Sequence, residues 1–375
     1  MNRRRLLGAL AVVTGLRGLG VPALAGTGPP FAVAVTTNDA MADFPNGVRF
    51  SLAASADVSI ERVELIYRIG PEATLNAAIP ALTPGERIET AYDLDARLNF
   101  LPPGVDLTYR WRLWSVDGGT AETEPRTLPW EDTRFTWQRF GTDQLAVFAY
   151  HDDRAFGQSV YDSAQRTVFR LQTDFGVPQS VPLRIWVYTS REDFALGTPP
   201  NSEPWIAGVT YIELLLTLAV VPPDNAEELG RVIPHEVSHL VLEQATANPY
   251  NRPPRWLDEG LAVYNQDAFA KDHEAEVRAA ATEDRLLSIR ALNSEFPYER
   301  EAFSLAYDQS LSIVNYIVAT DGTDGMASLI AAACDGVAHD DAVQQALGVS
   351  IDDLDRLWRE SLQSAAHGDE SGGPW

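Results

Sequence analysis

The chain has very little lysine and cysteine and no long apolar run, and each shortage argues against a class of protein. Cys334 is the only cysteine, so an intramolecular disulfide cannot form. No apolar run reaches the roughly 18 residues that a membrane-spanning helix requires. Lys271 is the only lysine, and 53 acidic residues against 29 basic ones give a formal net charge of −24. Such a field repels phosphate backbones, which argues against a nucleic-acid partner, and weakly attracts cationic substrates.

The first 25 residues have the three parts of a signal peptide in order. Arg3-Arg4-Arg5 is the positive segment, Leu6 to Leu16 is apolar, and Ala23-Leu24-Ala25 is a small-residue cleavage pattern. A short amphipathic helix is the alternative, and the arginines also resemble a twin-arginine signal. We expect export to the medium or cell envelope, with a mature chain that starts near Gly26. Because an exported protein without disulfides must rely on its cores, a bacterial or archaeal source is favoured.

Residues 31–138 have the pattern of a β domain. Apolar residues alternate with polar or small ones from Val48 to Leu52, from Val63 to Ile69 and from Leu107 to Leu113. Period-two alternation is typical of strands with one buried face. Turn signals such as Pro102-Pro103-Gly104 separate these stretches. The sequence predicts a small antiparallel β-sandwich, and its last hairpin resembles those of immunoglobulin or fibronectin type III domains.

Residues 143–362 have a different character and predict a second domain. A helix is expected from Asp153 to Gly176 and a buried strand from Leu183 to Tyr188, followed by nearly continuous helical spacing. Asp224 with Glu227 resembles a capping box for a helix that runs toward Gln244. Ser350 with Asp353 opens the last helix in the same way. Residues 367–375 are polar and Gly-rich, and we expect a frayed tail.

The motif that carries chemistry is His235-Glu236-Val237-Ser238-His239. Positions i and i+4 of a helix lie on one face, so His235 and His239 can bind one tetrahedral ion, and Glu236 can reach a water beside it. The segment 255–264, RWLDEGLAVY, places Glu259 20 residues after His239. A second helix packed against the first could bring Glu259 to the third ligand position. Two histidines and one glutamate with an open fourth position are a catalytic zinc set rather than a structural one.

HEVSH followed by WLDEGLAVY resembles the gluzincin clan, which includes thermolysin and the neutral aminopeptidases, and is most similar to bacterial peptidase MA-like domains. The resemblance spans about residues 145–362. It implies a zincin-like fold, one Zn²⁺ per chain held by His235, His239 and Glu259, and Glu236 as the general base. The G-x-M-E-N motif of the aminopeptidases is not found ahead of the zinc helix, so aminopeptidase activity is not supported.

Two positions depart from the family pattern. Pro234 removes a helical hydrogen bond to Gly230, so the zinc helix is expected to begin near Ile233 after a bent turn. Thermolysin has an aspartate four residues after its ligand glutamate, where this chain has Val263. Metal-bound histidines need such an outer partner, and Asp258 is the candidate substitute.

Two further segments could contribute to the site. Trp205 to Thr217 is either the edge strand along which zincins align a peptide or a buried core strand. Ala306 to Ser310 matches an A-Y-x-Q-S stretch of peptidase MA-like domains, in which the Tyr307 phenol could stabilise an oxyanion or simply fill the core. His151 beside two aspartates suggests a solvated turn, and His273, His339 and His367 are expected at the surface.

The sequence therefore predicts an α+β protein in which an N-terminal antiparallel β-sandwich precedes a zincin-like domain with a helical C-terminal half. The predicted activity is zinc-dependent hydrolysis of peptide or protein substrates through Glu236-assisted attack of water. Two alternatives stay open: a zinc amidohydrolase of cell-wall or other non-protein amides, and an inactive zincin scaffold that binds a partner. The sequence does not indicate an oligomeric state.

Overall fold

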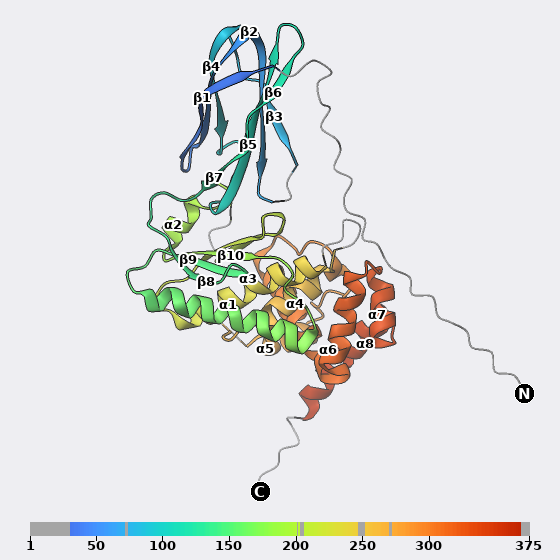
Figure 1. The fold of residues 1–375 in the computed structure, drawn as a ribbon. Helices are drawn as coiled ribbons and strands as arrows, with labels where there is room; N and C mark the ends of the chain where they lie inside the picture. The colour runs from blue at the N-terminus through green and yellow to red at the C-terminus, as the bar shows by residue number, and fades with distance from the viewer. Residues whose placement is uncertain are drawn as a thin grey trace, which may run out of the picture.

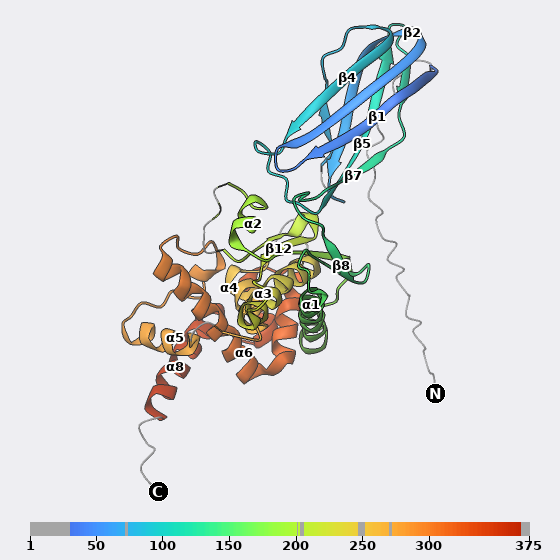
Figure 2. The same ribbon diagram turned by 90° about the vertical axis from the view of Figure 1, so that its left-hand side faces the viewer.

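The computed structural model describes residues 31–71, 74–200, 202, 206–246, 252–269 and 272–368. A β-rich N-terminal part stands on one end of a larger part that contains a second sheet and the helices (Figures 1 and 2). The expected signal peptide, residues 1–25, lies outside the described residues. Residues 367 and 368 of the expected frayed tail belong to the last helix, and the rest of that tail lies outside.

Seven strands form the N-terminal sheet, and one of them, β2, connects its two halves. β2 pairs with β1 and β4 through its first half and with β3 and β5 through its second, while β6 and β7 pair with β5. The strands are β1 (Val33–Asp43), β2 (Gly47–Ile69), β3 (Asn76–Ala78), β4 (Gly85–Asp95), β5 (Val105–Ser115), β6 (Thr120–Glu122) and β7 (Arg126–Trp130).

The expected two-sheet sandwich is not confirmed, because β2 passes through both halves and joins the seven strands into one hydrogen-bonded sheet. The pairing register of β2 shifts between Ser55 and Ile60, where its partners change. Phe50 of the first half still packs against Tyr67 and Tyr109 of the second, with ring centroids 6.1 and 5.0 Å apart. Aromatic side chains of the two halves of the sheet therefore pack together in the apolar core.

The second sheet has five strands in the order β11-β12-β10-β9-β8. β9, β10 and β12 run parallel, and β8 and β11 pair antiparallel at the two edges. The strands are β8 (Gln138–Gly141), β9 (Leu145–Ala149), β10 (Leu183–Tyr188), β11 (Gly208–Tyr211) and β12 (Leu216–Val220). The strand expected from Leu183 to Tyr188 is confirmed as β10. Because β8 pairs with β9, this sheet begins upstream of residue 143.

Helices make up most of the chain after β12, so the protein is a mixed α+β chain with an antiparallel sheet and a helical C-terminal half (Figure 1). The helix expected from Asp153 to Gly176 is confirmed as α1, which these two residues cap. Ser350 accepts a hydrogen bond from Asp353 N at the start of α8. No helix in the described part of the chain is long and apolar enough to cross a membrane. The helices are α1 (Arg154–Phe175), α2 (Arg191–Leu196), α3 (Ala226–Ala245), α4 (Arg255–Tyr264), α5 (His273–Thr282), α6 (Arg300–Cys334), α7 (His339–Leu347) and α8 (Ile351–Gly368), with short 3-10 turns at Ile212–Leu214 and Ala291–Asn293.

The start of α3 differs from the prediction. The helix begins at Ala226 and continues through Pro234, and its N-cap is Asn225 rather than Asp224. Proline leaves the carbonyl four residues earlier without its helical donor, but here the Gly230 oxygen accepts a hydrogen bond of 2.8 Å from Asp267 N. The prediction of a late helix start was therefore wrong, because a loop from outside the helix supplies the missing donor.

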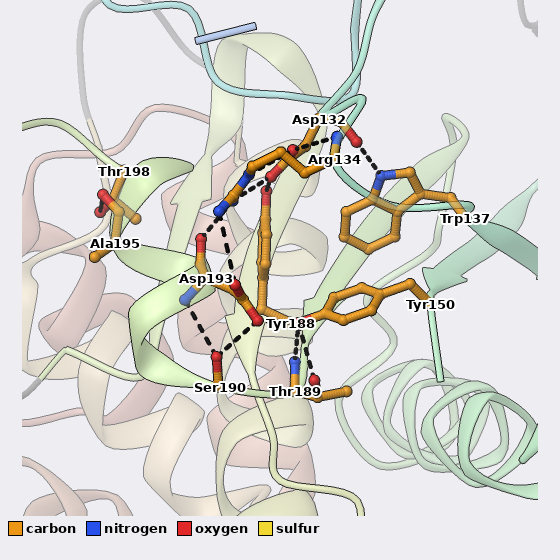
Figure 3. A network of polar contacts seen from close by, with 10 residues as sticks. All are labelled: Asp132, Arg134, Trp137, Tyr150, Tyr188, Thr189, Ser190, Asp193, Ala195 and Thr198. Carbon is orange, nitrogen blue, oxygen red and sulfur yellow. Dashed lines mark hydrogen bonds and ion pairs between the residues drawn. The ribbon is translucent and has the colours of Figure 1, made fainter. Parts of the chain in front are cut away.

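A buried polar network fastens the segment after β7 to the second sheet (Figure 3). Asp132, which is fully buried, accepts hydrogen bonds from Arg134 Nε at 2.9 Å and from the Tyr188 hydroxyl at 3.1 Å. Arg134 Nη2 donates to the Asp193 carbonyl at 3.0 Å, and the Tyr150 hydroxyl donates to Asp193 Oδ2 at 2.9 Å. The network connects residues 131–137, here called the linker, to the ends of β9 and β10 and to α2. The linker is therefore part of the packed structure.

Candidate metal centre

The two predicted motifs meet where α3 packs against α4. The Nε2 atoms of His235 and His239 are 3.2 Å apart, and Glu259 Oε2 lies 3.5 and 3.4 Å from them. A Cβ at Gly260 would collide with the Ser310 carbonyl of α6, so the glycine lets α4 approach α6 closely. Within the described ranges, His235, His239 and Glu259 are the one group of His, Cys, Asp and Glu side chains that could hold a metal ion.

The three donor atoms fit a zinc ion. Three atoms at zinc–ligand distances of about 2.0–2.1 Å and tetrahedral angles lie about 3.3–3.4 Å from one another. The observed separations of 3.2, 3.4 and 3.5 Å agree with this. Glu259 Oε2 is also buried without a hydrogen-bond partner, which is costly for a carboxylate unless a cation binds it.

The charges around the three side chains favour a cation at this point. Burial by itself would raise the pKa of Glu259, but His239 and His235 lower that pKa well below its ordinary value. Burial would likewise lower the pKa of His239, yet Asp258 and Glu259 raise it well above the ordinary value. The carboxylates thus attract positive charge strongly enough to overcome the cost of burial.

Each of the three side chains has an outer partner that fixes its orientation. Asp258 Oδ1 lies 2.9 Å from His239 Nδ1, so the carboxylate adjacent to Glu259 does point toward the histidine. The side-chain amide of Gln266 lies 3.0 Å from His235 Nδ1. Arg255 Nη2 lies 2.7 Å from Glu259 Oε1, which leaves Oε2 to face the histidines. Such contacts set the ring orientation and the basicity of metal ligands.

Two of these partners, Arg255 and Gln266, were not predicted from the sequence, although the position of Arg255 is a recognisable signal. Arg255 precedes Glu259 by four residues, the helical spacing that brings opposite charges together. Gln266 lies beyond the end of α4, and only the packing of its loop brings it to His235. The Asp267 N to Gly230 O hydrogen bond and the ion pair between Arg170 and Asp267, 2.7 Å, hold that loop against α3 and α1.

Glu236 lies beside the metal-binding group and faces the edge strand β11. Its side chain is buried, and its Oε2 accepts a hydrogen bond of 2.8 Å from Thr210 Oγ1. A Cβ at Gly208 would collide with Glu236 Oε1, so only glycine leaves room for this carboxylate. The segment from Trp205 to Thr217 therefore contains the edge strand β11 and the first two residues of the buried strand β12. Trp205 itself lies outside the described residues.

Tyr307 on α6 borders the same group. Its ring lies 6.2 Å from the His235 ring and is flanked by Phe296 and Phe303 at 5.5 and 5.0 Å. Burial raises the pKa of Tyr307 well above its ordinary value, and the charge of Glu259 adds to the rise. The phenol therefore keeps its proton at neutral pH and can donate a hydrogen bond.

The other histidines whose side chains the structure describes, His151, His273 and His339, lie outside this group. His273 was expected at the surface, but its side chain is 15% exposed and its Nδ1 lies 2.6 Å from the buried Asp308 Oδ1. His339 Nε2 lies 2.7 Å from the Arg252 carbonyl, and His151 Nδ1 accepts a hydrogen bond from Asp153 N at the start of α1. The prediction for His273 was wrong because Asp308, 35 residues away in the sequence, gives it a buried partner.

Comparison with known proteins gives one extended match. The family model described as the peptidase MA superfamily matches residues 163–364. This range contains all of α3, α4 and α6, and thus His235, His239 and Glu259 together with Glu236 and Tyr307. No curated protein matches the chain.

Matches to solved structures are short. Wild-type OgpA from Akkermansia muciniphila is 13% identical over 28% of this chain and 28% of its own, with a TM-score of 0.22. Catalytically inactive OgpA in complex with an O-glycopeptide substrate, glycodrosocin, is 12% identical over 28% and 30%, with a TM-score of 0.22. A family 56 carbohydrate-binding module, a β-1,3-glucan binding domain, is 18% identical over 24% of this chain and 95% of its own, with a TM-score of 0.17. Likenesses this slight carry no argument about fold or substrate.

Proposed function

The chain belongs to the peptidase MA superfamily, and on this premise we propose that it is a gluzincin-type zinc peptidase that hydrolyses peptide or protein substrates. One zinc ion per chain would be held by His235, His239 and Glu259. The observation that supports this most strongly is the convergence of two imidazole nitrogens and the unpartnered Glu259 Oε2 within 3.5 Å of one another. This donor set is the one that catalytic zinc sites use.

In the proposed mechanism, Glu236 takes a proton from the attacking water and later delivers it to the leaving amine. Tyr307, protonated at neutral pH, donates a hydrogen bond to the oxyanion that develops on the scissile carbonyl. Zinc, when bound, supplies polarisation of that carbonyl and acidification of the water. Asp258, Gln266 and Arg255 keep the three ligand side chains in one orientation.

The substrate is proposed to pair with β11 (Gly208–Tyr211). This strand lies at one edge of the second sheet, with β12 on its other side. The open side of an edge strand presents unpaired backbone groups, which an extended peptide can use as an added strand. Since Gly208 and Thr210 of the same strand contact Glu236, a peptide on β11 would lie close to the proposed base.

The function is tested by metal analysis of the purified protein together with two digests. We expect one zinc per chain and cleavage within a fluorogenic peptide library, but no release of fragments from peptidoglycan. Cleavage of peptidoglycan alone would indicate the amidohydrolase, and stoichiometric zinc without either hydrolysis would indicate an inactive scaffold. His239→Ala should lose stoichiometric zinc, whereas His339→Ala, on a histidine bound to the Arg252 carbonyl, should keep it. Unchanged zinc affinity in His239→Ala would contradict the ligand assignment.

Asp258→Ala is expected to weaken zinc affinity about 10- to 100-fold, because the His239 ring loses the carboxylate that orients it. Competition with a zinc chelator measures this affinity. Asp340→Ala, which removes an exposed carboxylate paired with Arg290, is the matched control and should leave the affinity unchanged. Equal affinities in the two variants would show that Asp258 does not support the metal site.

We also propose that the protein is exported to the cell envelope or the medium. The proposal rests on Arg3-Arg4-Arg5, the apolar stretch from Leu6 to Leu16 and the Ala23-Leu24-Ala25 pattern. Because a single cysteine cannot form an intramolecular disulfide, an exported chain must be stabilised by apolar packing, and the buried apolar residues of both sheets form one extended core.

A further inference from the structure

Two threonines of the second sheet form a hydroxyl chain that ends on Glu236. Thr210 and Thr217 lie directly opposite each other in the β11–β12 pair, and their Oγ1 atoms are 2.8 Å apart. Thr210 Oγ1 lies 2.8 Å from Glu236 Oε2, and the Glu236 carbonyl is farther, at 3.4 Å. Thr217 is fully buried and Glu236 is 8% exposed, so these groups bond to one another rather than to bulk water.

The number of available protons determines which group donates each hydrogen bond between Thr217, Thr210 and Glu236. A hydroxyl carries one proton, and an ionised carboxylate can only accept hydrogen bonds. Thr210 must therefore donate to Glu236 Oε2 when Glu236 acts as a base, and Thr217 must donate to Thr210. When Glu236 takes up a proton on Oε1, Oε2 remains an acceptor, so the bond from Thr210 persists.

We infer that Thr210 is a positioning residue for Glu236: it anchors Oε2, and Oε1 is left to exchange the proton with the attacking water. Thr217 in turn fixes the hydroxyl of Thr210. This inference rests on the proposed function. The space for Oε1 is provided by Gly208, which lies two residues before Thr210 and hence on the same face of β11.

The arrangement ties the base to the strand on which the substrate is proposed to bind. Successive side chains of a strand point to opposite faces, so Gly208 and Thr210 face Glu236, whereas Val209 and Tyr211 face away. Tyr211 instead packs against Phe100 of the N-terminal part, with ring centroids 6.2 Å apart. A shift of β11 would therefore move the peptide and Glu236 together, which keeps their relative position.

The test compares Thr210→Val, which removes the hydroxyl at nearly constant volume, with Thr210→Ser, which keeps it. With the most rapidly cleaved peptide of the library, Thr210→Val should lower kcat about 10- to 100-fold, because a misplaced base loses most of the benefit of orientation. KM should change less than about threefold, since substrate binding is not the interaction that is removed. Thr210→Ser should restore most of kcat, and Thr217→Val should lower it by a smaller factor. Zinc content should stay at one per chain.

Two controls separate this inference from the function on which it rests. Thr90→Val removes a hydroxyl that bonds the Ala81 carbonyl in the N-terminal sheet and should leave kcat unchanged. If Glu236→Gln is inactive but Thr210→Val and Thr217→Val both keep the wild-type kcat, the positioning role is wrong and the proposed function stands. A rise in KM alone would also overturn it, because Thr210 would then bind substrate. Crystal structures of zinc-loaded wild type and Thr210→Val should show Glu236 turned away in the variant; an unchanged carboxylate would contradict the inference.

Discussion

Glu236→Gln is expected to lose hydrolysis almost completely while the protein keeps its fold and one zinc per chain. The amide has nearly the same shape as the carboxylate, so the packing against Gly208 and the hydrogen bond from Thr210 can be retained. It cannot accept and return a proton at neutral pH, and general-base catalysis contributes about 10²- to 10⁴-fold in rate. The proposed ligands His235, His239 and Glu259 are untouched, so the metal content should not change.

The matched control is Glu227→Gln, the same substitution in the first turn of the same helix, where the side chain is exposed. Its activity and zinc content should equal those of the wild type. Metal analysis, thermal melting and peptide cleavage are measured on the three proteins in parallel. Near-normal turnover in Glu236→Gln would remove Glu236 from the role of base, and loss of zinc from this variant would show that it supports the metal site instead.

The convergence of His235, His239 and Glu259 could be expected from the sequence because most of its geometry is local. Two histidines at i and i+4 share a helix face whatever the rest of the chain does. Glu259 required one further step, a second helix, α4, packed against α3. The structure brings all three donor atoms together.

Asp258 was expected as an outer partner, and the structure places it against His239. Two other supporting residues, Thr210 and Gln266, could not be predicted, because they are brought in by tertiary contacts. Thr210 reaches Glu236 only through the pairing of β11 with β12, and Gln266 reaches His235 only through a loop docked on α3. The helix start predicted from Pro234 was wrong for the same reason, since the donor to Gly230 O comes from Asp267, 37 residues away. The continuity of the N-terminal sheet likewise depends on one strand, β2, that pairs on both sides along its length.

The C-terminal part of the chain is expected to fold without the N-terminal sheet, provided that the expressed fragment begins at the right residue. A fragment from residue 143 removes β8, which pairs with β9 at the edge of the second sheet. It also removes Phe135 and Trp137. The Phe135 ring stacks on Tyr150 at 3.9 Å, and the Trp137 ring lies 4.7 Å from Trp186 and 5.3 Å from Tyr188.

We therefore expect residues 131–368 to fold, melt cooperatively and bind one zinc, whereas residues 143–368 fail to do so. The longer fragment keeps Asp132, whose buried hydrogen bond from the Tyr188 hydroxyl would otherwise be lost with that hydroxyl left unpaired. It also keeps Arg134, which donates to the Asp193 carbonyl (Figure 3). Both fragments lack the N-terminal sheet, so their difference measures the linker and β8 alone. Folding of the shorter fragment with full zinc would show that the linker is dispensable. If residues 131–368 show no cooperative transition and bind no zinc, the N-terminal sheet is part of the catalytic unit. The Phe100–Tyr211 contact and the Asp106–Arg184 ion pair of 3.0 Å would then explain this dependence.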